Sequence, residues 1–110
     1  MNFEIIATDD FLKSVKKIYK KHKSIIDDLE NLEQLLSENP TFGTSLGNNL
    51  FKIRLAISSS GKGKSGGSRI ITYVKLIDSI VYMAEIYLKS EISNVDEKNI
   101  LQRLADDKLI

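Results

Sequence analysis

Residues 69–88 read RIITYVKLIDSIVYMAEIYL, a segment rich in β-branched and aromatic side chains that is interrupted once, by Asp78 and Ser79. This composition is typical of strands, and a polar pair between two such runs suits a tight hairpin turn. The sequence therefore predicts two antiparallel strands, 69–77 and 80–88, that form the centre of a small sheet.

A third strand is predicted upstream, over residues 51–57. Apolar residues alternate there with Lys52, Arg54 and Ala56, which is the pattern of a half-buried strand with two cations on its other face. The connection over residues 58–68 is rich in glycine and serine, and this composition predicts a mobile link to the hairpin. Residues 41–49, before the third strand, are expected to form a loop.

Two helices are predicted near the N-terminus, after a short strand over residues 3–7. Apolar residues recur at steps of three and four over 11–22, directly after Thr8, whose hydroxyl can cap a helix start. A second apolar stripe covers 25–36 and must end before Pro40. Because the connection between the stripes is short, we expect an αα-hairpin.

The fold class that follows is α+β. We expect a small antiparallel β-sheet packed against the N-terminal αα-hairpin, with a C-terminal helix whose apolar residues run from Ile100 to Leu109. On the strand 80–88, the alternate residues from Ile80 to Leu88 are expected to face the helical hairpin together. A length of 110 residues fits a single domain, 1–110.

Composition excludes several classes of function. The chain has no cysteine and one histidine, His22, so a disulfide framework, a thiolate zinc site and a multi-histidine metal centre are excluded. We expect no cofactor and no metal. No stretch approaches the roughly 20 apolar residues that cross a bilayer, and the N-terminus lacks a signal-peptide pattern. The expected location is the cytoplasm.

Charge is distributed unevenly along the chain, although the net charge is only +1. Residues 40–77 contain six basic residues and no Asp or Glu: Lys52, Arg54, Lys62, Lys64, Arg69 and Lys75. A block of one sign inside a folded domain indicates a site for an anion, and nucleic acid is the commonest such partner. The alternative is a solvated loop.

The predicted strands bring the candidate catalytic residues to the sheet face opposite the helical hairpin, because side chains two apart on a strand share a face. These residues are Lys52, Arg54, Arg69, Tyr87 and Lys89. Candidate RNA-binding residues beside them are Lys62, Lys64 and Lys75. Cations can stabilise charge on phosphate oxygens, and a tyrosine ring can stack on an unpaired base. From charge pattern alone, an exposed solvated face is an equally good interpretation.

The reaction that suits these residues is attack on a phosphodiester by the 2′-OH of RNA itself. Lys52 is the first candidate for the base, because Arg54 and Arg69 nearby would disfavour a further positive charge. Glu85 is the second candidate, although pairing with Arg69 is the interpretation we favour for it. Tyr87 or Lys89 would orient the base or protonate the leaving oxygen.

Three segments together resemble one known family. They are Phe51-Lys52-Ile53-Arg54-Leu55-Ala56, the run from Gly61 to Ile71 that reads GKGKSGGSRII, and Ile86-Tyr87-Leu88-Lys89-Ser90-Glu91. The chain resembles the RelE/ParE toxin superfamily, nearest its HigB-like and RelE-like members. The resemblance implies the toxin of a bacterial type II toxin-antitoxin system, a cognate antitoxin as partner, and an endoribonuclease that cuts mRNA on the ribosome.

Carried over by position, the resemblance implies that Lys52 and Arg54 are the basic pair of the family and that Arg69 binds phosphate. Tyr87 and Lys89 lie where the family has catalytic or base-stacking residues near the C-terminus. Two alternatives stay open. ParE-like members inhibit DNA gyrase on the same fold, and an inactive basic binding module would also carry the cationic face.

Overall fold

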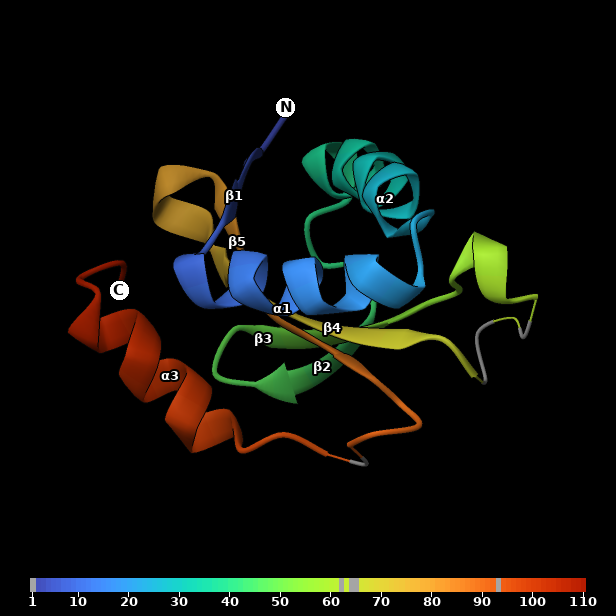
Figure 1. Ribbon diagram of the computed structural model, residues 1–110. Helices are drawn as coiled ribbons and strands as arrows, with labels where there is room; N and C mark the ends of the chain where they lie inside the picture. The colour runs from blue at the N-terminus through green and yellow to red at the C-terminus, as the bar shows by residue number, and fades with distance from the viewer. Residues whose placement is uncertain (1, 62, 64–65, 93) are drawn as a thin grey trace.

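The computed structural model describes residues 2–61, 63, 66–92 and 94–110. It has an α+β fold, as predicted, with three helices and a five-stranded sheet (Figure 1). In chain order the elements are β1 (Glu4–Ala7), α1 (Asp9–Lys21), α2 (Ile25–Glu38), β2 (Thr44–Gly47), β3 (Leu50–Leu55), η1 (Ser58–Ser60), β4 (Ser68–Lys75), η3 (Leu76–Asp78), β5 (Ile80–Leu88) and α3 (Glu97–Asp106).

The strands lie in the order β1-β5-β4-β3-β2. Strands β2 to β5 are antiparallel neighbours, whereas β1 pairs parallel with the first half of β5. The short strand β2 lies within the segment that we predicted to be a loop. It forms because Asn48 and Asn49 turn the chain back onto β3 with φ angles of 54° and 65°, a left-handed conformation that asparagine tolerates in hairpins.

The helical hairpin covers one face of the sheet, as predicted, and α3 lies on the other side (Figure 1). Helix α1 begins where expected, since the Thr8 hydroxyl oxygen accepts a hydrogen bond from the Phe11 N–H. The first apolar cluster joins α1 and α2 to the sheet through Phe11, Val15, Ile18, Ile25, Leu29, Leu32, Leu36, Ile53, Ile57, Ile70, Val74, Val81, Met83, Ile86 and Leu88. Burial of these side chains holds the two layers together.

A second apolar cluster lies on the opposite face, beneath α3. Its buried members are Leu50, Ile71, Tyr82, Ala84, Tyr87, Ile100 and Leu104. The register of β5 against β4 shifts at Ala84, which has no partner of its own in β4. This β-bulge turns Tyr82 to the second cluster while Ile86 stays in the first, so the prediction that all alternate residues from Ile80 to Leu88 face the helical hairpin is wrong.

Gly67 allows the connection after β3 to pack closely against the sheet. A Cβ at this position would collide with the carbonyl oxygen of Leu55 and lie 3.0 Å from the Cα of Ala56, both of which are backbone atoms. We expect Gly67→Ala to lower the free energy of unfolding by about 1–3 kcal/mol in urea titrations. Gly47→Asn, at a glycine with φ of 83° and open space around it, is the control that should change little.

Candidate active site on the second sheet face

Arg54, Arg69 and Tyr87 form a straight row across three strands. Arg54 on β3 lies directly opposite Arg69 on β4, and Arg69 lies directly opposite Tyr87 on β5. Residues paired in this way have Cβ atoms about 4.5–5.5 Å apart. Like charges in such a pair destabilise a sheet, so the position of the two arginines favours a functional interpretation over a structural one. We call these three residues the cationic row.

Lys52 and Lys89 flank the cationic row. Lys52 lies two residues before Arg54 on β3, hence on the same face, and is half-buried. Lys89 follows the end of β5, where its backbone N–H donates a hydrogen bond of 3.1 Å to the Gly67 carbonyl, and its side chain is exposed. The structure therefore brings the five predicted catalytic residues to one part of the sheet.

Of the three predicted RNA-binding lysines, the structure describes Lys75 alone. Lys75 lies at the far end of β4, six residues and about 20 Å along the strand from Arg69. Its Nζ lies 3.0 Å from the Asp78 carboxylate and donates to the Leu109 carbonyl at 3.1 Å. The structure thus does not place Lys75 beside the cationic row. Lys62 and Lys64 lie outside the described residues.

Two of the three residues of the cationic row are buried. Arg69 is 3% exposed and Tyr87 is 4% exposed, whereas Arg54 is exposed. The Arg69 Nη1 donates a hydrogen bond of 3.0 Å to the Ser68 carbonyl, and the Tyr87 ring belongs to the second apolar cluster with Ile100. Packing of α3 through Ile100 therefore covers Tyr87, and Arg69 is buried as well, although strand alternation alone predicted that both side chains face solvent.

The Tyr87 hydroxyl is buried and has no hydrogen-bond partner among the described residues. Burial raises the pKa of this hydroxyl above its ordinary value, and the positive charge of Arg69 offsets part of the shift. Tyr87 is accordingly protonated at neutral pH. Chemically, it is suited to donate a proton and unsuited to accept one.

Tyr87→Phe separates a structural role of the hydroxyl from a catalytic one. Removing a buried unpaired hydroxyl should leave the free energy of unfolding unchanged or raise it by about 1 kcal/mol. Loss of a proton donor should slow RNA cleavage by about 100-fold or more. Urea titration and a cleavage assay on the same sample check both effects, and unchanged cleavage would remove Tyr87 from the reaction.

Glu85 is occupied by partners other than the predicted one. Its Oε1 accepts hydrogen bonds from the Ser14 hydroxyl at 2.8 Å and from the Ile86 N–H at 3.0 Å. Its Oε2 lies 3.3 Å from Arg103 on α3, which also pairs with Asp10 at 3.1 Å. The pairing that we expected with Arg69 is replaced by the pairing with Arg103, because α3 packs over this face. With these contacts, Glu85 is a poor candidate for the base.

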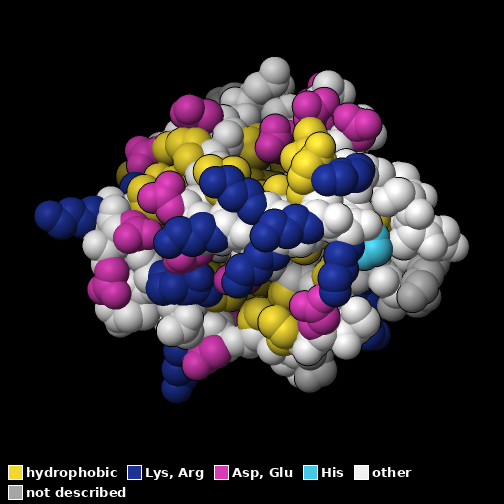
Figure 2. Space-filling model, in the orientation of Figure 1, with side chains coloured by type: hydrophobic (Ala, Val, Ile, Leu, Met, Phe, Trp, Pro, Cys, Tyr) yellow, Lys and Arg dark blue, Asp and Glu magenta, His cyan; other side chains and the backbone are white. Residues whose placement is uncertain are grey.

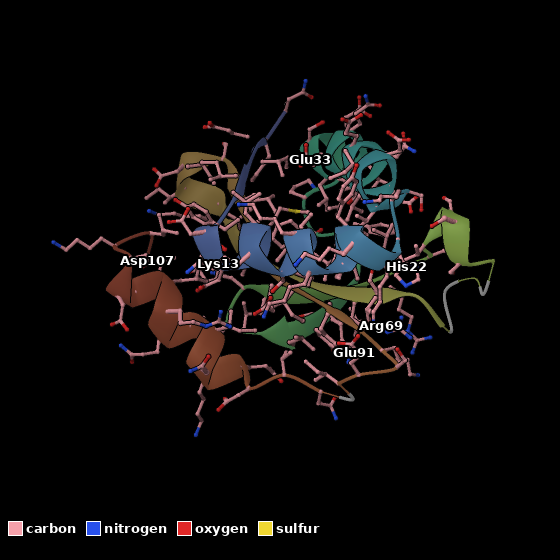
Figure 3. All side chains as sticks on the ribbon, viewed as in Figure 1. Lys13, His22, Glu33, Arg69, Glu91 and Asp107 are labelled. Carbon is pink, nitrogen blue, oxygen red and sulfur yellow. The ribbon has the colours of Figure 1, made fainter. Side chains whose placement is uncertain are left out.

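A cavity of about 290 Å³ lies beside this site, between α1 and the end of β5. Its polar lining includes Ser14, Lys17 and Lys21 from one side and Tyr87 and Glu91 from the other. Figure 3 shows Arg69 and Glu91 at the same end of the molecule as His22, which directly follows α1. Sequence reasoning did not join the two lysines to the site, because about 70 residues separate them from Tyr87.

Within the described ranges, no group of three or more His, Cys, Asp or Glu side chains is placed to hold a metal ion. No helix in the part of the chain that the structure describes is long and apolar enough to span a membrane.

Comparison with known families gives one match that covers almost the whole chain. Residues 5–109 match the family described as the RelE toxin of the RelE / RelB toxin-antitoxin system. The chain belongs to the RelE toxin family. This confirms the resemblance to the RelE/ParE superfamily, and membership of the RelE family implies a cognate antitoxin as partner.

The fold agrees with a solved RelE structure. A mutant of the E. coli toxin RelE in the free state superposes with a TM-score of 0.59 at 14% sequence identity, covering 84% of this chain and 90% of that one. At this identity the likeness concerns the fold alone. Among curated proteins, none matches the sequence.

Proposed function

We propose that the chain is a toxin that cuts mRNA as a metal-independent endoribonuclease, acting on the ribosome in the cytoplasm. The observation that carries this proposal is the cationic row, in which two arginines and a protonated tyrosine are paired side by side across three strands. Such groups can hold a phosphate and supply a proton. Membership of the RelE family supports the toxin role.

In the proposed reaction, the 2′-oxygen of one nucleotide attacks the adjacent phosphorus while the bond from phosphorus to the 5′-oxygen breaks. Lys52 accepts the proton of the 2′-OH, and Arg54 and Arg69 stabilise the charge on the non-bridging oxygens. Tyr87 donates a proton to the leaving 5′-oxygen, with Lys89 as the alternative donor. The products carry a 2′,3′-cyclic phosphate, or a 3′-phosphate after its hydrolysis, and a free 5′-hydroxyl.

Access to the site requires a conformational change in this proposal. Arg54 and Lys89 are exposed, but Arg69 and Tyr87 are covered. RNA reaches Tyr87 when α3, which contributes Ile100 to the cluster around this ring, moves away from the sheet. Lys62 and Lys64 remain proposed phosphate contacts on the connection before β4.

Brief induction of the chain in bacterial cells, followed by mapping of RNA ends, tests the proposed activity. We expect new mRNA ends within coding frames, growth arrest, and intact DNA, and co-expression of the antitoxin should suppress all new ends. DNA damage with intact mRNA would instead identify a gyrase inhibitor. Growth arrest with intact mRNA and intact DNA would leave only the remaining alternative, an inactive basic binding module.

A further inference from the structure

Two lysines of α1 line the cavity between α1 and the end of β5. Lys17 and Lys21 lie one helical turn apart, and both side chains are exposed. Within the described part of the chain, neither side chain has an ion pair or a hydrogen bond. Like charges at this spacing repel each other, and an anion bound between them would offset that repulsion. Figure 2 shows Lys and Arg side chains gathered over α1.

The rest of the cavity lining is mostly apolar. Ile18, Ile86 and Leu88 are buried, whereas Ile92 is 44% exposed although its side chain is large and apolar. Glu91, which follows β5, adds an exposed carboxylate. The cavity therefore combines cations from α1 with an apolar surface and a hydrogen-bond acceptor from the β5 side.

This combination fits a nucleotide better than it fits a simple anion. The phosphate of a nucleotide suits the lysine pair, while the base offers a flat apolar surface to Ile92 and N–H groups to the Glu91 carboxylate. A simple anion would meet the repulsion of Glu91 and would bring no N–H group to offset it. The volume of about 290 Å³ is near the lower end for ligand sites, which suits a single nucleotide.

The cavity reaches the cationic row through Tyr87, which belongs to both. A nucleotide bound there would lie beside the residues that we propose to cut RNA. No described residue of α3 lines the cavity, whereas α3 contributes Ile100 to the cluster that covers Tyr87. RNA can therefore occupy the cavity before α3 moves.

We propose that this cavity binds one nucleotide of the RNA substrate, next to the nucleotides joined by the bond that is cut. Lys17 and Lys21 hold its phosphate. Ile92 packs against its base, and the Glu91 carboxylate accepts hydrogen bonds from N–H groups of that base. Occupation of the cavity is the first contact of the substrate, and displacement of α3 follows it. This inference rests on the RNA substrate proposed above.

Binding of a short single-stranded RNA, measured by fluorescence anisotropy, tests the proposal. Fluorine replaces every 2′-OH of this RNA, so the proposed reaction cannot cut it. We expect Lys17→Gln combined with Lys21→Gln to weaken binding by about 10-fold or more, because two charge-assisted phosphate contacts are lost. The slope of the logarithm of the association constant against the logarithm of the salt concentration should become shallower by about 1.4, or about 0.7 for each lysine.

Lys16→Gln combined with Lys20→Gln is the matched control. It removes the same charge from the same helix at the same spacing, but these two lysines line a different cavity, on the α2 side of α1. Its affinity should stay within about 2-fold of the wild type at about 0.15 M salt, where charges more than about 8 Å apart are largely screened. Ile92→Ser should weaken binding by about 5-fold without changing the salt slope, because it removes apolar contact and no charge.

Circular dichroism of each variant establishes that it is folded. Equal losses of affinity for the two lysine pairs would overturn the proposal, because binding would then depend on the charge of α1 and not on the cavity. It would also be overturned if the wild type did not bind the RNA, or if Lys17→Gln combined with Lys21→Gln bound it with wild-type affinity. A loss of binding confined to this pair, in a toxin that leaves mRNA intact in cells, would support the cavity and refute the nuclease.

Discussion

Arg54→Ala is expected to lower the rate of RNA cleavage by about 100- to 1,000-fold, the effect of removing one preorganised charge from a transition state. The free energy of unfolding should change by less than about 0.5 kcal/mol, because the Arg54 side chain is exposed. The substitution also removes the repulsion between Arg54 and Arg69, which lie directly opposite each other, and this acts to raise the free energy of unfolding. The rate is measured on programmed ribosomes and the stability by urea titration.

Two further variants make this test specific. Arg54→Lys keeps the charge but loses the two-point grip on phosphate, so it should recover only part of the rate. Lys98→Ala removes an exposed cation from α3 and should cut RNA at the wild-type rate. If Arg54→Ala also cut at the wild-type rate, the cationic row would not be the active site. Arg69→Ala is a less informative variant, because Arg69 is buried and its removal also affects packing.

Local sequence pattern predicted most of the elements. The run of β-branched and aromatic residues predicted β5 with the bounds that the structure has, and β4 to within two residues at each end. The bulge at Ala84 could not be predicted in this way. At the bulge, β5 contacts a residue from the start of the chain: the Thr8 hydroxyl lies 3.2 and 3.3 Å from the carbonyl oxygens of Met83 and Ala84. These contacts join residues 75 and 76 positions apart in the sequence.

The composition of the candidate site was also predictable in part. A period of two along each strand placed Arg54, Arg69 and Tyr87 on one face, and pairing of neighbouring strands aligned them in one row. The burial of Tyr87 depended on α3, which packs Ile100 onto this face and brings Arg103 to Glu85. Such burial follows from tertiary packing and leaves no signal in the alternation of the strands.

Substrate-assisted attack predicts the largest effect of all. The groups near the cationic row stabilise charge and transfer protons, so the nucleophile in our proposal is the 2′-OH of the RNA. An mRNA with one 2′-deoxynucleotide on the 5′ side of the scissile phosphate lacks that nucleophile, although it still pairs in the ribosome. Cleavage at that bond should therefore fall to the background rate, whatever the affinity of the toxin for the complex.

The measurement uses programmed ribosomes, a mapped cleavage site, and two mRNAs that differ only in the position of a single 2′-deoxynucleotide. We expect no cleavage when the substitution lies directly 5′ of the scissile phosphate. When the substitution lies one nucleotide further upstream, we expect wild-type cleavage, with a 2′,3′-cyclic phosphate or 3′-phosphate and a free 5′-hydroxyl. Efficient cutting of the first mRNA would contradict the proposed mechanism.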